Sequence, residues 1–304
     1  MLWFLASRVD LRALVPRHEA STLSWVAVGL VLSLTALVLS SLRWKRVLSV
    51  LGRPAPLSAL LSHTLAGQFV SNFLPSSVGG DVLRAARLSS TGEARSTSFA
   101  SVVLERLSGF VALPLITLVA LAASPGLRRL GAASSLALAL SVVTLVGLGA
   151  LLFAAGNGRV GARLAAGSKW TGFASALHLG IARIRQQPAA AFMVLATAVA
   201  YQLTIVCASW AGAHALGMSV GWWPVMAFVP VVAIAQVLPV SLNGIGLREG
   251  AFVLLLAPLG VAAGQAVAFG LLLYGMNLVV SLLGAPAFAI GARPPAARTP
   301  QMAV

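Results

Sequence analysis

Long apolar stretches alternate with short basic segments along the 304-residue chain. A helix of roughly 20 apolar residues is long enough to cross a bilayer. On this basis we predict membrane-spanning helices over residues 23–42, 98–123, 130–155 and 189–213, and a last span that ends near residue 292. The pattern therefore predicts an all-α polytopic membrane protein.

Two segments interrupt the apolar pattern, and they repeat each other. Residues 72–84 read "NFLPSSVGGDVLR" and residues 236–248 read "QVLPVSLNGIGLR". Six positions are identical at an offset of 164 residues: Leu74/Leu238, Pro75/Pro239, Ser77/Ser241, Gly80/Gly244, Leu83/Leu247 and Arg84/Arg248. Proline ends a helix and glycine lets the chain reverse tightly. Each segment therefore predicts a broken helix, shaped by Pro75, Gly79, Gly80, Pro239, Gly244 and Gly246.

Composition supports the membrane assignment and narrows the chemistry. Hydrophobic residues make up 59% of the chain and charged residues 9%, with a mean hydropathy of +0.95. No globular core of this length could hide so much apolar surface, whereas a bilayer can solvate it. The single Cys207 excludes an internal disulfide and a cysteine-based metal centre, and no residues have metal-ligand spacing. We expect neither a metal nor a cofactor.

The net charge of +15 comes from basic residues scattered between the apolar runs. That distribution is typical of cytoplasmic loops and of contacts with anionic lipid headgroups, and it argues against nucleic-acid binding. If residues 57–80 crossed the bilayer, the basic groups at 43–53 and 84–95 would lie on opposite sides. A re-entrant hairpin keeps both groups in the cytoplasm, as the positive-inside rule requires.

Three crossings then separate the two repeated segments, so the second hairpin enters the membrane from the other side. The chain is therefore predicted to contain an inverted repeat of about three helices each, over about 23–125 and 189–291. Both repeats belong to one integral membrane domain, residues 1–292, followed by a disordered tail at 293–304. Arg128 and Arg129 fall outside in this topology and oppose the charge rule.

The basic linker over residues 159–185 carries apolar residues at helical spacing: Trp170, Phe173, Leu177, Ile181 and Ile184. It predicts either a helix that lies in the membrane interface or a solvated linker with some apolar contact to the bundle.

Inverted repeats with broken helices are the architecture of secondary transporters, whose substrate site lies near the middle of the membrane. Broken backbone in a bilayer survives only where protein or a water-filled cavity satisfies it. Helix amino termini attract anions, and arginines bind phosphate oxygens. The candidate substrate-binding residues are Asn72, Ser77, Asp81, Arg84, Glu105, Arg106, Gln236, Ser241, Asn243, Arg248 and Glu249.

Glu105 and Arg106 are neighbours on a predicted helix and do not face each other. We expect each to pair elsewhere, with Asp81 or Arg84 as the candidates. Charged residues inside a span are functional by default. A structural ion pair that holds the hairpin would account for the same residues.

Three stretches resemble a known family: "NFLPSSVGGDVLRAARL", "ASVVLERLSGFVAL" and "LPVSLNGIGLREGAFVLLL". They are similar to the flippase-like transmembrane domain of lysylphosphatidylglycerol synthases, and the resemblance covers residues 8–290. It implies an all-helical domain of a bacterial or archaeal cell membrane that moves aminoacylated or glycosylated lipids between leaflets. The sequence looks like a stand-alone form, since it lacks the synthase domain, and its first span looks truncated to "MLWFLA".

Three functions remain open. The first is a lipid translocator that carries a phosphate-bearing or otherwise anionic headgroup. The second is a membrane-embedded transferase acting on a phospholipid or polyprenyl-phosphate, with Asp81 or Glu105 as general base. The third is a partner subunit for a separate lipid-modifying enzyme. We favour transport, and so expect no catalytic residue, because the acidic residues do not cluster in the sequence.

Overall fold

The computed structural model describes residues 20–73, 78–88, 92–156, 171–237 and 244–291. These residues form helices joined by turns and include no strand. Five of the described helices are long and apolar enough to cross a membrane: α2 (Ala20–Val50), α5 (Gly92–Ala123), α7 (Ala132–Gly156), α10 (Pro188–Ala215) and α13 (Ala263–Leu282). The predicted all-α membrane class is confirmed.

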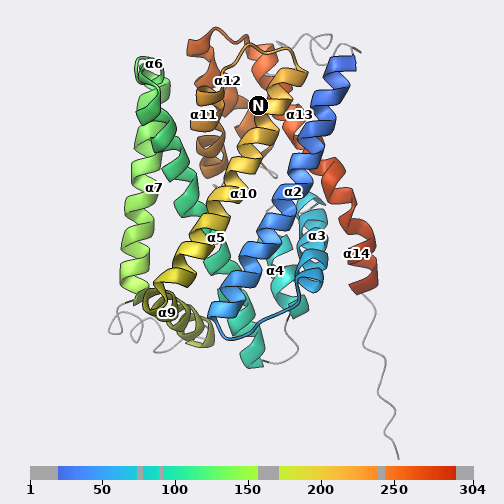
Figure 1. Cartoon of the computed structure of the whole chain (residues 1–304), viewed down its shortest axis with the longest axis vertical. Coiled ribbons are helices and arrows are strands. Elements are labelled where there is room, and N and C mark those ends of the chain that lie inside the picture. The colour runs from blue at the N-terminus through green and yellow to red at the C-terminus, as the bar shows by residue number, and fades with distance from the viewer. Residues whose placement is uncertain (1–19, 74–77, 89–91, 157–170, 238–243, 292–304) are drawn as a thin grey trace, which may run out of the picture.

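Shorter helices form the two predicted interruptions. The first is the pair α3 (Leu57–Phe73) and α4 (Val78–Leu88), and the second is the pair α11 (Trp222–Ala235) and α12 (Leu247–Leu256). Figure 1 shows α3 and α4 in the lower half of the bundle and α11 and α12 in the upper half. The break residues Pro75, Ser77, Pro239, Ser241 and Asn243 lie outside the described residues.

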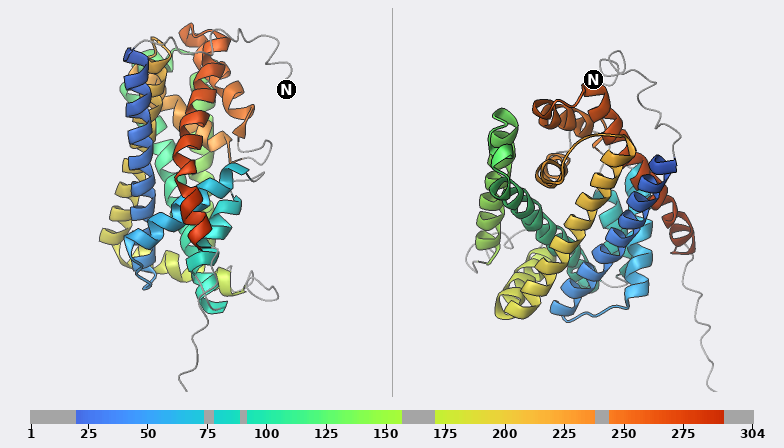
Figure 2. Two further views of the ribbon diagram at one scale, coloured as in Figure 1. Left: turned by 90° about the vertical axis from the view of Figure 1, so that its right-hand side faces the viewer. Right: turned by 45° about the horizontal axis from the view of Figure 1, so that its top comes forward.

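The remaining short elements are α6 (Pro125–Arg128), α9 (Thr171–Gln186), η3 (Ala257–Leu259) and α14 (Gly284–Gly291). In Figure 2, α9 lies across the lower end of the bundle. Its Ile181 is buried against Val47 of α2 and Leu104 of α5. The described part of the linker therefore is a helix with apolar contact to the bundle. Trp170 and the disordered tail predicted at 293–304 lie outside the described residues.

Two predicted boundaries differ from the structure. Helix α2 continues to Val50 instead of ending at residue 42, because Trp44, Val47 and Leu48 of its last turns are buried in the core. The predicted last span is α13 followed by α14. At their junction, Gly284 lies so close to the carbonyl of Leu65 that a Cβ atom there would collide with it.

The helix contacts follow a regular scheme. Helix α2 packs along α10, α5 packs on α11, and α3 packs on α13. When α2 to α5 are matched in order to α10 to α13, the α5–α11 contact maps onto the α13–α3 contact. The α2–α10 contact maps onto itself. An inverted repeat requires this pattern, and the repeat itself stays a prediction.

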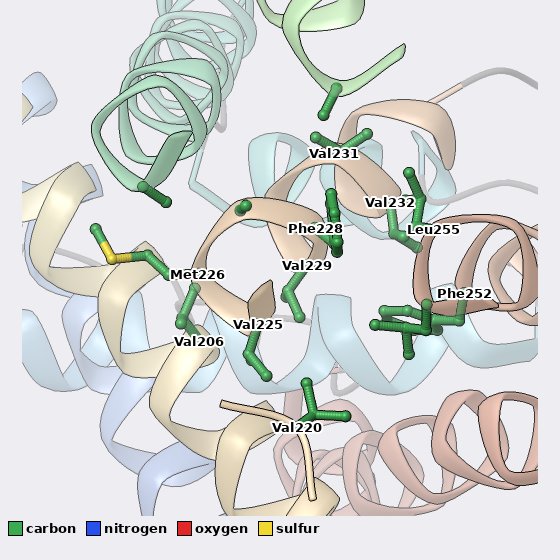
Figure 3. Packing of buried hydrophobic residues seen from close by; sticks show 14 of the residues in the cluster. Val206, Val220, Val225, Met226, Phe228, Val229, Val231, Val232, Phe252 and Leu255 are labelled. Atoms are coloured by element: carbon green, nitrogen blue, oxygen red, sulfur yellow. The ribbon is translucent and has the colours of Figure 1, made fainter. Parts of the chain in front are cut away.

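The two ends of the bundle differ in what fills them. Around α11 the interior is apolar, with Val225, Phe228 and Val232 packed near Phe252 (Figure 3). The rings of Phe252 and Phe269 lie 4.8 Å apart. The interior beside α3 and α4 instead holds most of the buried charged side chains of the described residues.

Candidate functional site

Two glycines let α3 and α4 pack backbone against backbone. A Cβ atom on Gly67 would lie 2.7 Å from Cγ of Arg84, and one on Gly80 would collide with Ser71 and with the carbonyl of Gly67. Gly79 and Gly80 both lie within α4, so Gly80 acts through close packing instead of through chain reversal. In the second hairpin Gly244 and Gly246 do adopt the positive φ that favours glycine, at 79° and 86°.

Glu105 of α5 is the centre of a buried charge cluster. It accepts hydrogen bonds from Nε and Nη2 of Arg43, the former at 2.9 Å, and from the hydroxyl of Ser40 at 3.3 Å. Its other oxygen lies 3.3 Å from Nη2 of Arg84. Two arginines from α2 and α4 thus converge on one carboxylate.

Asp81 extends this cluster toward the surface. One of its oxygens lies 3.4 Å from Nη1 of Arg84 and the other lies 2.8 Å from Nε of Arg106. Glu105 and Arg106 therefore do pair elsewhere, with Arg84 and Asp81 as expected. Five charges alternate in the order Arg43, Glu105, Arg84, Asp81 and Arg106, and the arginines leave one positive charge in excess.

Aromatic rings fix the two buried guanidinium groups. Cζ of Arg84 lies 4.4 Å from the ring centroid of Trp44, and Cζ of Arg43 lies 4.9 Å from that of Tyr201. The ring face attracts a cation, most strongly where water is excluded. Trp44 is itself held by a 2.9 Å hydrogen bond that its indole N–H donates to Ser101.

A polar cavity of about 90 Å³ opens beside this cluster. Its lining consists of Ser40, Arg43, Thr64, Gly67, Gln68, Ser71, Asp81, Arg84, Glu105, Arg106 and Tyr201. About 15 Å³ of such volume holds one water, so several waters or a small oxyanion fit. Nη1 of Arg43, Nε of Arg84 and Oγ1 of Thr64 are buried and have no hydrogen-bond partner in the described part of the chain.

The side chains around the cavity indicate what it could bind. Its lining includes three arginines, Arg43, Arg84 and Arg106, and the hydroxyl residues Ser40, Thr64 and Ser71. Guanidinium and hydroxyl groups can both donate hydrogen bonds to an oxygen atom. This lining has the chemistry that suits an oxyanion.

Arg248 and Glu249 form a separate buried site at the start of α12. The backbone N–H of Gly246 donates a 2.6 Å hydrogen bond to Glu249. Cζ of Arg248 lies 5.2 Å from the ring centroid of Tyr274. Neither residue lines the polar cavity, so the two repeated arginines occupy different sites.

Two other predicted residues are described away from the cavity. Asn72 donates a hydrogen bond to the carbonyl of Gln68 at 3.2 Å. Gln236 caps α11 and lies against Gly244. Neither residue is among those that line the cavity.

Several lining residues were missed from the sequence. The sequence predicts Arg43 as a basic residue flanking the first predicted span, because the apolar run ends before it. On α3, Thr64, Gln68 and Ser71 lie three and four residues apart, which puts them on one face of a helix. That polar face inside an apolar run was a usable signal. Gln68 also donates a 2.6 Å hydrogen bond to Asn277, which joins α3 to α13.

Arg87 ties the first hairpin to the last helix. It donates hydrogen bonds to the carbonyls of Ala287 and Phe288 in α14, at 3.0 and 2.8 Å. Phe288 is among the last four residues of α14, whose carbonyls lack partners within the helix. Arg87 thus has a structural contact as well as the charge expected of a cytoplasmic anchor.

The described residues contain no group of three or more His, Cys, Asp or Glu side chains that could hold a metal ion. No curated protein and no solved structure matches the chain. One family does match, described as the lysylphosphatidylglycerol synthase TM region, and the match covers residues 1–284. This agrees with the resemblance carried by the two broken-helix segments and by the stretch around Glu105. The chain therefore belongs to the family of the lysylphosphatidylglycerol synthase transmembrane region.

Proposed function

We propose that the protein moves a lipid with a phosphate-bearing headgroup between the leaflets of a bacterial or archaeal cell membrane. The headgroup oxyanion binds in the polar cavity while the acyl chains stay in the bilayer. One observation carries the proposal: the side chains of Arg43, Arg84 and Arg106 line a polar cavity large enough for an oxyanion.

The charge balance of the cavity suits transport. Three arginines alone would hold an anion tightly in a medium of low dielectric constant. Asp81 and Glu105 offset two of these charges, so the bound anion meets one excess positive charge. A carrier must bind strongly enough to admit its substrate and weakly enough to release it.

The depth of the site supports the same function. Glu105 is the fourteenth residue of the 32-residue α5, which places it about 20 Å along the helix. Glu105 also lies within the candidate membrane span Arg95–Ala123, and charges inside a span are costly unless they pair or serve a substrate pathway. Here they do pair, and they also border a cavity.

The transferase alternative has less support from this geometry. A general base needs a carboxylate that is free to take a proton. Asp81 and Glu105 each contact two arginines, so both oxygens of each carboxylate already have an ion-pair partner. No contact in the described residues favours the partner-subunit alternative over transport.

Reconstitution into liposomes with fluorescent phospholipids tests the proposal. The protein should exchange lipid between leaflets without changing it chemically. Arg84→Gln should slow exchange about tenfold or more, since a hydrogen bond to a charged group contributes about 1.5–3 kcal/mol. Arg84→Lys should recover part of the rate, because it keeps the charge but loses the planar fork.

Arg95→Gln is the matched control, because Arg95 is an exposed arginine at the start of α5 that does not line the cavity. Its exchange rate should equal that of the parent protein. Arg248→Gln tests whether the second repeated arginine also lies on the path. An unchanged rate for Arg84→Gln would refute the role of the cavity, and a new lipid product would support the transferase.

A further inference from the structure

Side-chain exposure rises from Glu105 through Arg84 and Asp81 to Arg106. The side chain of Glu105 is 1% exposed, those of Arg43 and Arg84 are 5% and 7% exposed, that of Asp81 is 18% exposed and that of Arg106 is 43% exposed. The other residues that line the cavity are buried or half-buried, and Arg106 is exposed. The polar cavity therefore reaches the surface beside Arg106.

We propose that the Asp81–Arg106 ion pair is the entrance of this cavity, and that Arg106 is the residue that first attracts the anion. The proposal rests on the cavity being a headgroup site. The pair joins α4 to α5 across the mouth of the cavity, with 2.8 Å between Asp81 and Nε of Arg106. It is the most exposed ion pair of the cluster.

The difference in burial gives the two ends of the cluster different roles. An ion pair at the surface of the protein is broken at less cost than a buried pair, so an arriving anion can exchange with Asp81. A buried pair is costly to break because it leaves an uncompensated charge. The Arg43–Glu105 pair therefore closes the inner end, and the Asp81–Arg106 pair can open.

Arg84 is positioned to receive the anion from Arg106. Both residues contact Asp81, so the carboxylate can turn from one arginine toward the other. The contacts of Arg84 with Asp81 and Glu105 are long, at 3.4 and 3.3 Å, and its Nε has no partner in the described residues. An oxyanion displacing Asp81 from Arg106 would thus meet a second arginine before losing the first.

Thiol labelling tests the entrance without depending on lipid transport. Ser71 lines the cavity, so a Ser71→Cys reporter on a Cys207→Ser background reports on access. The rates of reaction with an anionic and a cationic methanethiosulfonate of similar size are compared. Arg106→Gln should lower the anionic-to-cationic rate ratio about tenfold or more, since a cleft of one charge sign raises the on-rate of its counter-ion by 10- to 1000-fold.

Arg106→Lys should restore most of this ratio, because it keeps the charge at the mouth. Arg95→Gln should leave the ratio unchanged, since Arg95 lies on the same helix but does not line the cavity. Variants are compared only when they are monodisperse and melt within a few degrees of the parent, and Arg106→Ala replaces Arg106→Gln if the latter does not fold. An unchanged anionic-to-cationic rate ratio in Arg106→Gln would refute the proposal that this ion pair is the entrance.

The same samples separate this idea from the proposed function. If the labelling ratio changes but the parent protein moves no phospholipid in liposomes, the entrance stands and the transport proposal fails. If the parent protein moves lipid but the labelling ratio does not change in the Arg106 variants, the entrance proposal is refuted and the transport proposal stands.

Discussion

Glu105 is the most deeply buried charge of the cluster, and it neutralises parts of two arginines at once. Removing its charge would leave Arg43 and Arg84 buried without their shared counter-ion. We expect Glu105→Gln to destabilise the protein by about 3–5 kcal/mol, the usual cost of breaking a buried pair. Unfolding in detergent, followed by circular dichroism against denaturant, measures this loss.

The exposed Arg95 gives the reference for that measurement, and Arg95→Gln should stay within about 0.5 kcal/mol of the parent. Asp81→Asn should fall between the two, because Asp81 is partly exposed. If Glu105→Gln were as stable as Arg95→Gln, the cluster would not hold the hairpin.

At the scale of elements, the first hairpin depends on the close approach of α3 and α4 at Gly67 and Gly80. Gly80→Ala would drive a methyl group into Ser71 and the carbonyl of Gly67. Backbone atoms cannot move aside cheaply, so we expect a loss of about 1–3 kcal/mol. Gly149→Ala in α7 is the control, since nothing lies within 4 Å of its added Cβ, and it should be neutral or stabilising by up to about 1 kcal/mol. Equal melting temperatures for the two variants would contradict the close packing.

At the scale of the whole molecule, the two hairpins lie in opposite halves of the bundle (Figure 1). The prediction of an inverted repeat is tested by cysteine labelling in intact membranes on a Cys207→Ser background. The exposed residues Arg53 and Gln187 precede α3 and α10, which begin in the lower half of the bundle (Figure 1), and exposed Ser219 precedes α11. Arg53→Cys and Gln187→Cys should be labelled from the cytoplasm, and Ser219→Cys only from outside, because basic residues favour the cytoplasmic side. Labelling of Arg53→Cys and Ser219→Cys from one side would contradict the inverted arrangement.

Much of this architecture could be predicted from local properties of the chain. The length of an apolar run predicts whether the segment crosses the bilayer, because the transfer of each side chain from water to lipid depends mainly on that side chain. Pro75 and Pro239 with their glycines predict two broken helices, because the limits on φ act within a few residues. Arg84 and Asp81 were among the expected partners of Glu105 and Arg106, since few charges were available to match them, whereas Arg43 was not expected to contact Glu105.

Which residues line the cavity could not be predicted from local properties, because they come from helices far apart in the sequence. Arg43 and Glu105 are 62 residues apart, and Tyr201 comes from α10. The predicted repeat also did not indicate that Glu105 would have no charged counterpart in the second half. Position 269, which is 164 residues after Glu105, is a phenylalanine that packs on Phe252. By itself, the sequence determined the membrane class, the helices and the two breaks, because these depend on burial in lipid and on backbone limits. Only the tertiary structure decided that Arg43, Arg84 and Glu105 meet around a cavity, because that depends on which helix faces approach and on the glycines that let them do so.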